Sequence, residues 1–168
     1  MSSSHLSRPS SSLFIYGSLL LALLLNIFPW GNHAWVPDWF LIALVFWTLN
    51  EPRKIGIGIA FIFGLLMDVQ TSSILGVHSL SYSLVAFVTI AWHRRILDLS
   101  TPSQMFHLLP MFLIASGVNY LVFWVTKNSS VFDGLLIFVP SLVEILLWPA
   151  AKWMLSTPQR RQNKSLPL

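Results

Sequence analysis

The stretch Leu13–Trp30 reads LFIYGSLLLALLLNIFPW and contains no charged residue in 18 positions. A run of about 18 or more apolar residues is long enough to cross the hydrocarbon of a bilayer as a helix. The run is long for the core of a secretory signal, and Pro29-Trp30-Gly31 after it shows no small-x-small cleavage pattern. We therefore interpret this stretch as the first membrane-spanning helix.

Five further apolar blocks follow, each bounded by proline, glycine, asparagine or charged residues. They cover Trp35–Leu49, Ile55–Val69, Leu75–Trp92, Phe106–Thr126 and Leu135–Leu155. Open sheets leave backbone groups unpaired in lipid, and the blocks lack the polar and apolar alternation of barrel strands, so helices are the physical choice. The sequence predicts an all-α integral membrane protein with six transmembrane helices in residues 13–155. A cytoplasmic tail at 1–12 and a basic cytoplasmic tail at 156–168 flank this domain.

The composition also indicates a membrane protein. Of the 168 residues, 55% are hydrophobic and 10% are charged, and the mean hydropathy is +0.69. Soluble domains carry about 25% charged residues, so a water-soluble monomer is excluded. Six spans also leave no room for a separate soluble catalytic domain. The chain has no cysteine, which excludes disulfides, iron–sulfur clusters, thiolate zinc sites and cysteine nucleophiles.

Lysine and arginine gather on one side of the predicted helices. With six spans and the N-terminus inside, nine of the ten basic residues are cytoplasmic, and Lys127 alone lies outside. This positive-inside bias predicts that both termini lie in the cytoplasm. The net charge of +4 is then a signal of topology and of anionic lipid contact. No basic face or aromatic platform is present to hold a strand, so we expect no nucleic-acid partner.

A stripe of small residues runs along the third block. Its members, spaced four residues apart on one helix face, are Gly56, Ala60, Gly64 and Asp68. Small side chains let a second backbone approach closely, so we expect the stripe to face protein, with internal packing favoured over a partner helix.

Two interpretations stay open for Asp68 at the end of this stripe. In the first, its carboxylate accepts hydrogen bonds from the following loop, at Thr71, Ser72 and Ser73, and so ends the helix. In the second, it is a proton, ion or partner-recognition site.

Glu144 lies about ten residues into the sixth block, where a carboxyl group costs a few kcal/mol unless it is paired or neutral. We expect a hydrogen bond between a neutral Glu144 and Asn119 of the fifth block. The alternative is a proton-coupled transport site. With Asn26 and Asp68, these are the polar residues that we place in the membrane, and we expect them to lie at different depths.

Patterns of catalytic and cofactor sites are missing from the sequence. The five histidines form no H-x-x-x-H pair, and there is no Walker loop, G-x-S-x-G elbow or paired-carboxylate motif. We therefore predict that the chain is not an enzyme and holds neither a metal nor a cofactor.

Several short motifs follow one another along the chain. They are Pro37-Asp38-Trp39, Phe46-Trp47-Thr48-Leu49, Pro52-Arg53, Gly64-Leu65-Leu66-Met67-Asp68 and Leu75-Gly76-Val77, with supporting matches at Ile27-Phe28-Pro29-Trp30, Val122-Phe123-Trp124 and Leu147-Trp148-Pro149. In this order the motifs resemble the family of rod shape-determining proteins MreD, over almost the whole chain. The positions that the resemblance marks as partner-binding or structural are Pro37, Trp47, Pro52, Gly64, Asp68 and Gly76.

The resemblance implies a non-enzymatic scaffold of the bacterial inner membrane. Members of this family bind MreC, which links them to MreB, RodA and penicillin-binding protein 2, and so help to organise lateral peptidoglycan synthesis and maintain rod shape. The resemblance also implies a fold similar to the S-components of ECF transporters. A second function thus stays open, a substrate-binding or transport subunit for a small metabolite or lipid-linked precursor, which requires a roomy cavity with several convergent polar groups.

Overall fold

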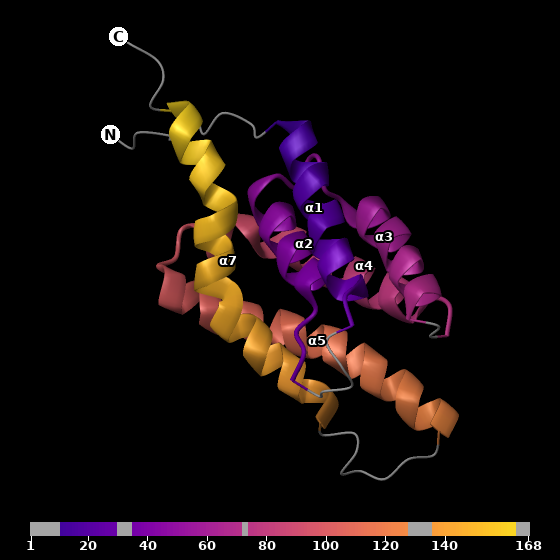
Figure 1. Ribbon diagram of the computed structural model, residues 1–168. Coiled ribbons are helices and arrows are strands. Elements are labelled where there is room, and N and C mark those ends of the chain that lie inside the picture. Colours follow the sequence, from indigo (N-terminus) through magenta and orange to yellow (C-terminus); the bar gives the residue numbers. More distant parts are fainter. Residues whose placement is uncertain (1–10, 30–34, 72–73, 128–135, 164–168) are drawn as a thin grey trace.

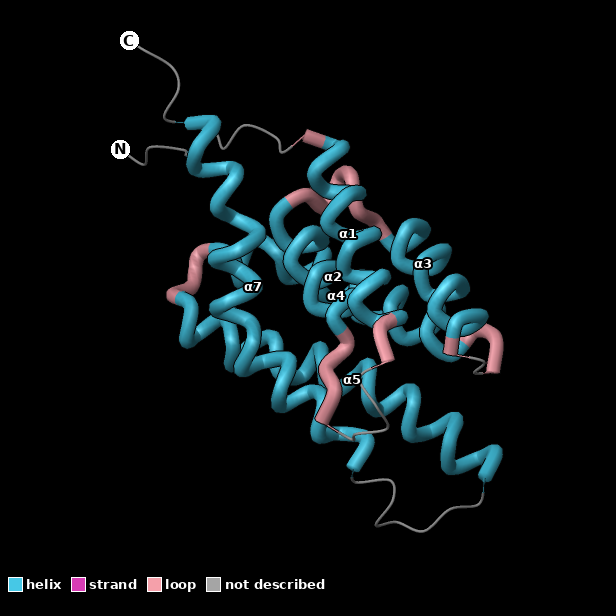
Figure 2. Tube along the Cα trace, in the orientation of Figure 1, coloured by secondary structure: helices cyan, strands magenta, loops and turns pink. Residues whose placement is uncertain are grey.

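The computed structural model describes residues 11–29, 35–71, 74–127 and 136–163. In these ranges the chain forms six α-helices and one 3-10 helix, with no strand. They are α1 (Ser12–Ile27), α2 (Trp39–Asn50), α3 (Ile57–Gln70), α4 (Val77–Leu97), α5 (Thr101–Lys127), η1 (Leu136–Phe138) and α7 (Val139–Asn163). The predicted all-α class is confirmed, and each predicted block corresponds to one α-helix. Figure 2 shows that helices make up nearly all of the described chain.

The helix ends differ from the predicted blocks. Residues 156–163 continue α7, which does not end at the predicted boundary of Leu155. Residues 1–10 of the N-terminal tail and 164–168 of the C-terminal tail lie outside the described residues.

Several helices are short for a membrane. α2 has 12 residues, which at about 1.5 Å per residue rise about 18 Å, against about 30 Å of hydrocarbon. α1 and α3, with 16 and 14 residues, are also short apolar helices. Within the described chain, only α5, over Thr101–Thr126, is long and apolar enough to cross a membrane by itself.

Successive α-helices run in opposite directions, so that α1 begins and α7 ends at the same end of the molecule (Figure 1). We call this the terminal end. At the opposite end, the distal end, α1 and α3 finish while α2, α4 and α7 begin. Residues far apart in the sequence therefore meet at the distal end.

α2 lies at the centre of the molecule and packs against α1, α4 and α7. Every residue from Phe40 to Leu49 is buried, which explains why this segment is apolar on all faces. The indole of Trp47 donates a 2.8 Å hydrogen bond to the hydroxyl of Ser18 on α1. The ring of Phe46 lies 6.3 Å from that of Trp148 on α7. These contacts fix the neighbours of α2 around it.

The outer faces of the helices carry large apolar side chains. The exposed ones include Leu13, Leu20, Leu24, Phe61, Ile62, Leu66, Leu80, Phe87, Leu142 and Leu146. Soluble monomers rarely expose contiguous apolar patches beyond a few hundred Å². The surface of this molecule is therefore suited to hydrocarbon and not to water.

The stripe on α3 packs against α4 inside the molecule. Ala60, Gly64 and Asp68 are buried, whereas Gly56 precedes α3 and has open space beside it. At Gly64 the two backbones nearly touch, because a Cβ atom placed there would lie 2.4 Å from the Cα of Ser79. The close approach that the sequence predicted is thus made within the chain, between α3 and α4.

Substituting Gly64 by alanine should destabilise the protein, although alanine favours a helix more than glycine does by about 1 kcal/mol. The added methyl group would force α3 and α4 apart, and overpacking of this kind costs about 1–3 kcal/mol. Gly58→Ala in the same helix is the matched control, because no atom lies within 4 Å of its Cβ position. We expect a lower thermal unfolding midpoint for Gly64→Ala alone, measured on purified protein in detergent. Equal thermal unfolding midpoints for Gly64→Ala and Gly58→Ala would contradict the close contact between α3 and α4 at Gly64.

Candidate functional site

The N-terminus of α2 is capped by the carboxylate of Asp38. The first amides of a helix lack partners within the helix, and an aspartate directly before it supplies an acceptor. Asp38 Oδ1 accepts a 2.9 Å hydrogen bond from the backbone N–H of Leu41. The negative charge also lies at the positive end of the helix dipole. Asp38 therefore begins α2 at the distal end.

The same carboxylate joins α2 to α1 and α4. Asp38 Oδ1 also accepts from Asn26 Nδ2 at 2.7 Å, and Oδ2 accepts from the hydroxyl of Tyr82 at 2.5 Å. Asn26 in turn accepts the backbone N–H of Trp39 at 2.9 Å. Its backbone carbonyl accepts from Gln70 Nε2 on α3 at 3.3 Å. One aspartate and one asparagine thus hold together the distal ends of four helices.

Glu144 links α7 to the hydrogen-bonded cluster of Asp38 and Asn26. Its Oε1 accepts the backbone N–H of Asp38 at 3.1 Å, and the residue is 3% exposed. The prediction of a hydrogen bond between Glu144 and Asn119 is wrong. Asn119 Nδ2 donates to the carbonyl of Ala115, one turn earlier on α5, at 3.0 Å. The local carbonyl satisfies the amide, while the start of α2 supplies the donor for Glu144.

Asp68 caps α4 from the neighbouring helix. Its Oδ1 accepts the backbone N–H of His78 at 2.8 Å and lies 2.9 Å from His78 Nδ1. Its Oδ2 accepts the backbone N–H of Gly76 at 2.8 Å, together with the backbone N–H and the hydroxyl of Ser79 at 3.4 and 3.1 Å. The side chain is fully buried in this ring of donors, which compensates the cost of burying a charge.

The sequence suggested Thr71, Ser72 and Ser73 as donors to Asp68. The hydroxyl of Thr71 donates to the carbonyl of Met67, and Ser72 and Ser73 lie outside the described residues. The donors to Asp68 that the structure describes come from the start of α4, where Gly76 has φ +104. Only glycine adopts this conformation without strain. Gly64, Asp68 and Gly76 thus form one structural unit that brings α4 onto α3 and caps it.

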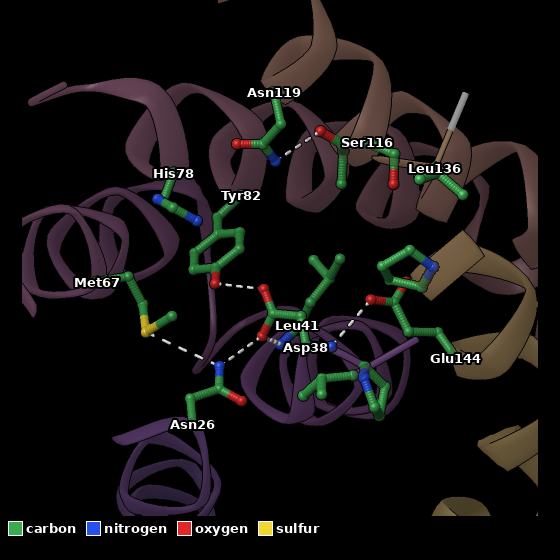
Figure 3. Close-up of a pocket in the computed structure, with 14 residues that line it drawn as sticks. Asn26, Asp38, Leu41, Met67, His78, Tyr82, Ser116, Asn119, Leu136 and Glu144 are labelled. Carbon is green, nitrogen blue, oxygen red and sulfur yellow. Dashed lines mark hydrogen bonds between the residues drawn. The ribbon is translucent and has the colours of Figure 1, made fainter. Parts of the chain in front are cut away.

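A cavity of about 430 Å³ lies between the helices at the distal end. Figure 3 shows that Asp38, Tyr82, Asn26 and Glu144 surround it together. The lining residues are Asn26, Val36, Pro37, Asp38, Leu41, Met67, His78, Tyr82, Ala115, Ser116, Asn119, Leu136, Pro140 and Glu144. Asn26, Asn119 and Glu144 therefore share one cavity. Asp68 is not in the lining, but its hydrogen-bond partner His78 is.

The remaining motif residues are placed as follows. Pro37 is buried and lines the cavity, while Trp47 lies fully buried at the α1–α2 contact. Pro52 lies in the turn between α2 and α3, close to the ion pair of Glu51 and Lys54 at 4.0 Å. Within the described residues, no three His, Asp or Glu side chains are arranged to hold a metal ion.

Sequence reasoning missed Asp38, Tyr82 and His78 as site residues. Asp38 carried a usable signal, since an aspartate directly before an apolar helical block is a typical N-cap. Tyr82 and His78 carried none, because a tyrosine or histidine in an apolar block is equally compatible with ordinary packing.

Comparison with known proteins identifies the family of the chain. The family model described as rod shape-determining protein MreD matches residues 7–156. The chain belongs to the MreD family. A relative in Haemophilus influenzae, a rod shape-determining protein MreD, is 29% identical over 138 residues, which are 80% of this chain and 83% of the relative. No solved structure matches the chain.

Family membership gives the chain a role in rod shape determination and identifies it as a membrane protein. The family that the motifs resembled is thereby confirmed.

The hydrogen bond between Tyr82 and Asp38 should contribute to stability. Tyr82→Phe removes the donor, and we expect a loss of about 1–3 kcal/mol because a buried acceptor is left with fewer partners. Tyr120→Phe is the matched control, since only a ring contact with Phe138 involves that side chain. The double variant Asp38→Asn/Tyr82→Phe should lose less than the sum of the single variants, by about 0.5–3 kcal/mol. Strict additivity in equilibrium unfolding would show that the two groups do not interact.

Proposed function

We propose that the chain is a non-enzymatic scaffold subunit of the machinery that elongates the bacterial cell wall. It binds MreC and, through MreC, is linked to MreB, RodA and penicillin-binding protein 2. The observation that carries this proposal is the MreD family match over residues 7–156. The same family relation supports an inner-membrane location.

In this proposal the chain crosses the inner membrane six times, with both termini in the cytoplasm. Six antiparallel α-helices in the described chain favour an even number of crossings. The basic residues Arg53, Lys54, Arg94, Arg95 and Lys152 belong to segments at the terminal end. Of the basic residues in described segments, Lys127 at the end of α5 is the exception. This distribution favours a cytoplasmic terminal end, and the short helices are accommodated by local thinning of the bilayer.

The distal end then faces the periplasm and carries the surface for MreC. Asp68 and Gly76 hold the start of α4 against α3, and the contact at Gly64 sets the distance between the two helices. Such a preorganised surface lowers the entropy cost of binding a membrane-proximal segment of a partner.

Reporter fusions test the topology. A cytoplasmic fluorescent reporter and a periplasmic phosphatase reporter, each fused after residue 168 and before residue 1, should report a cytoplasmic location for both termini. A phosphatase inserted in the segment 128–135 should be active, since this segment connects α5 to η1. Termini on opposite sides of the membrane would contradict the six-span arrangement.

Depletion and co-purification test the scaffold role. Rod-shaped cells depleted of the chain should become round, and added metabolites should not restore their shape. Gly64→Leu should lower co-purification with MreC several-fold, because the leucine displaces the start of α4. Gly58→Leu, whose side chain enters open space, should retain it. If Gly64→Leu is inserted at normal abundance and still co-purifies with MreC, this surface is not the binding site.

The cavity at the distal end favours a second candidate, a ligand-binding subunit. Its volume of about 430 Å³ falls in the range of small-molecule sites, about 300–1,000 Å³. Several polar groups converge on it, as such a site requires. Scaffold and ligand-binding roles are compatible, because the cavity lies within the molecule and leaves its outer faces available to a partner.

A further inference from the structure

The cavity at the distal end is acidic. Two carboxyl groups, those of Asp38 and Glu144, belong to its lining, and no lysine or arginine does. Among the described lining residues, His78 alone has a side chain that can carry a positive charge, and its Nδ1 already lies 2.9 Å from Asp68 Oδ1. In a low-dielectric interior, such a lining repels anions and favours cations.

The two carboxyl groups differ in their hydrogen bonds. Asp38 accepts hydrogen bonds from Asn26, Leu41 and Tyr82. Glu144 accepts one, from the backbone of Asp38, and its buried Oε2 has no hydrogen-bond partner among the described residues. A buried carboxylate oxygen without a donor is destabilising, because it has lost its hydrogen bonds to water. Figure 3 shows the Glu144 carboxyl group pointing toward Asp38 at the floor of the cavity.

The walls of the cavity are largely apolar. Besides the polar groups they comprise Val36, Pro37, Leu41, Met67, Ala115, Leu136 and Pro140. A matching ligand is therefore amphipathic, with an apolar part against these side chains and an N–H donor toward Glu144.

We propose that the distal cavity binds a primary ammonium group, with Glu144 as its counter-ion. The ammonium pairs with the carboxyl group of Glu144, which accepts a single described hydrogen bond, and its charge is shared with the neighbouring carboxylate of Asp38. Ser116 and Asn119 on the opposite wall contact the rest of the ligand (Figure 3). The site excludes pyrophosphate and other anions, which find no lysine or arginine among its described lining residues. This proposal rests on the second candidate function, ligand binding, and not on the contact with MreC.

A primary ammonium group occurs in two kinds of ligand, a soluble amine and the headgroup of an aminophospholipid. The distal cavity lies where the helices end, so that either can reach it from the outer leaflet or from water. The shared feature is the protonated primary amine, and the experiment below separates the sources.

Binding is measured with hexylammonium, hexanol and hexanoate on the full chain in phosphatidylcholine nanodiscs. The three probes share one alkyl chain and differ in charge. We expect saturable binding of hexylammonium by calorimetry and at least tenfold weaker binding of the other two. Glu144→Gln should weaken hexylammonium binding at least tenfold, whereas Glu144→Asp retains part of it. Glu51→Gln, at the opposite end of α2, is the matched control and should bind as the unsubstituted chain does.

Lipid retention is measured by native mass spectrometry after reconstitution in phosphatidylethanolamine and phosphatidylglycerol. Retention of phosphatidylethanolamine that is lost in Glu144→Gln identifies the headgroup as the source. Hexylammonium binding without such retention identifies a soluble amine.

The proposal is overturned if hexanol or hexanoate binds as tightly as hexylammonium. It is also overturned if none of the probes binds, or if Glu144→Gln binds hexylammonium unchanged. A Glu144→Gln variant that has lost its unfolding transition is replaced by Asn119→Leu, which fills the opposite wall and should weaken binding as well. None of these results bears on cell rounding or on MreC co-purification, so that the two proposals fail separately.

Discussion

Two buried or half-buried carboxylates at helix N-termini hold the distal end of the molecule together. Asp38 caps its own helix, α2, and Asp68 caps α4 from α3. Each places a negative charge at the positive end of a helix, where amides lack partners. In hydrocarbon an unpaired amide or an unpaired carboxylate costs several kcal/mol. The pairing therefore fixes where α2 and α4 begin, and with them the shape of the cavity and of the surrounding surface.

The short central helix explains why this end is hollow. α2 rises only about 18 Å and is surrounded by α1, α4 and α7, so that its N-terminus lies within the molecule. The polar side chains of its neighbours turn toward that N-terminus, as Tyr82 and Glu144 do. A helix long enough to reach the surface would fill the space that the cavity occupies. The proposed surface for MreC and the cavity thus depend on the same arrangement of helices.

The sequence predicted the helices and a close backbone approach along the stripe of α3, because apolar blocks and i, i+4 spacing are local patterns. It did not predict the cavity, because its contacts join residues far apart in the chain. Asp38 is separated from Asn26 by 12 residues, from Tyr82 by 44 and from Glu144 by 106. No local pattern decides between such partners. The pairing of Glu144 with Asn119 was plausible on helix faces, but neither face indicated that the backbone amide of Asp38 would be the donor to Glu144.

The central claim is that a carboxylate from α3 holds the first turn of α4. Hydrogen–deuterium exchange at single backbone amides, in nanodiscs, tests it most directly in Asp68→Ala. The amides of Gly76, His78 and Ser79, which donate to Asp68, should exchange at least tenfold faster than in the unsubstituted chain. The amide of Leu41, which donates to Asp38, should exchange at an unchanged rate. Unchanged protection in the first turn of α4 would contradict the account.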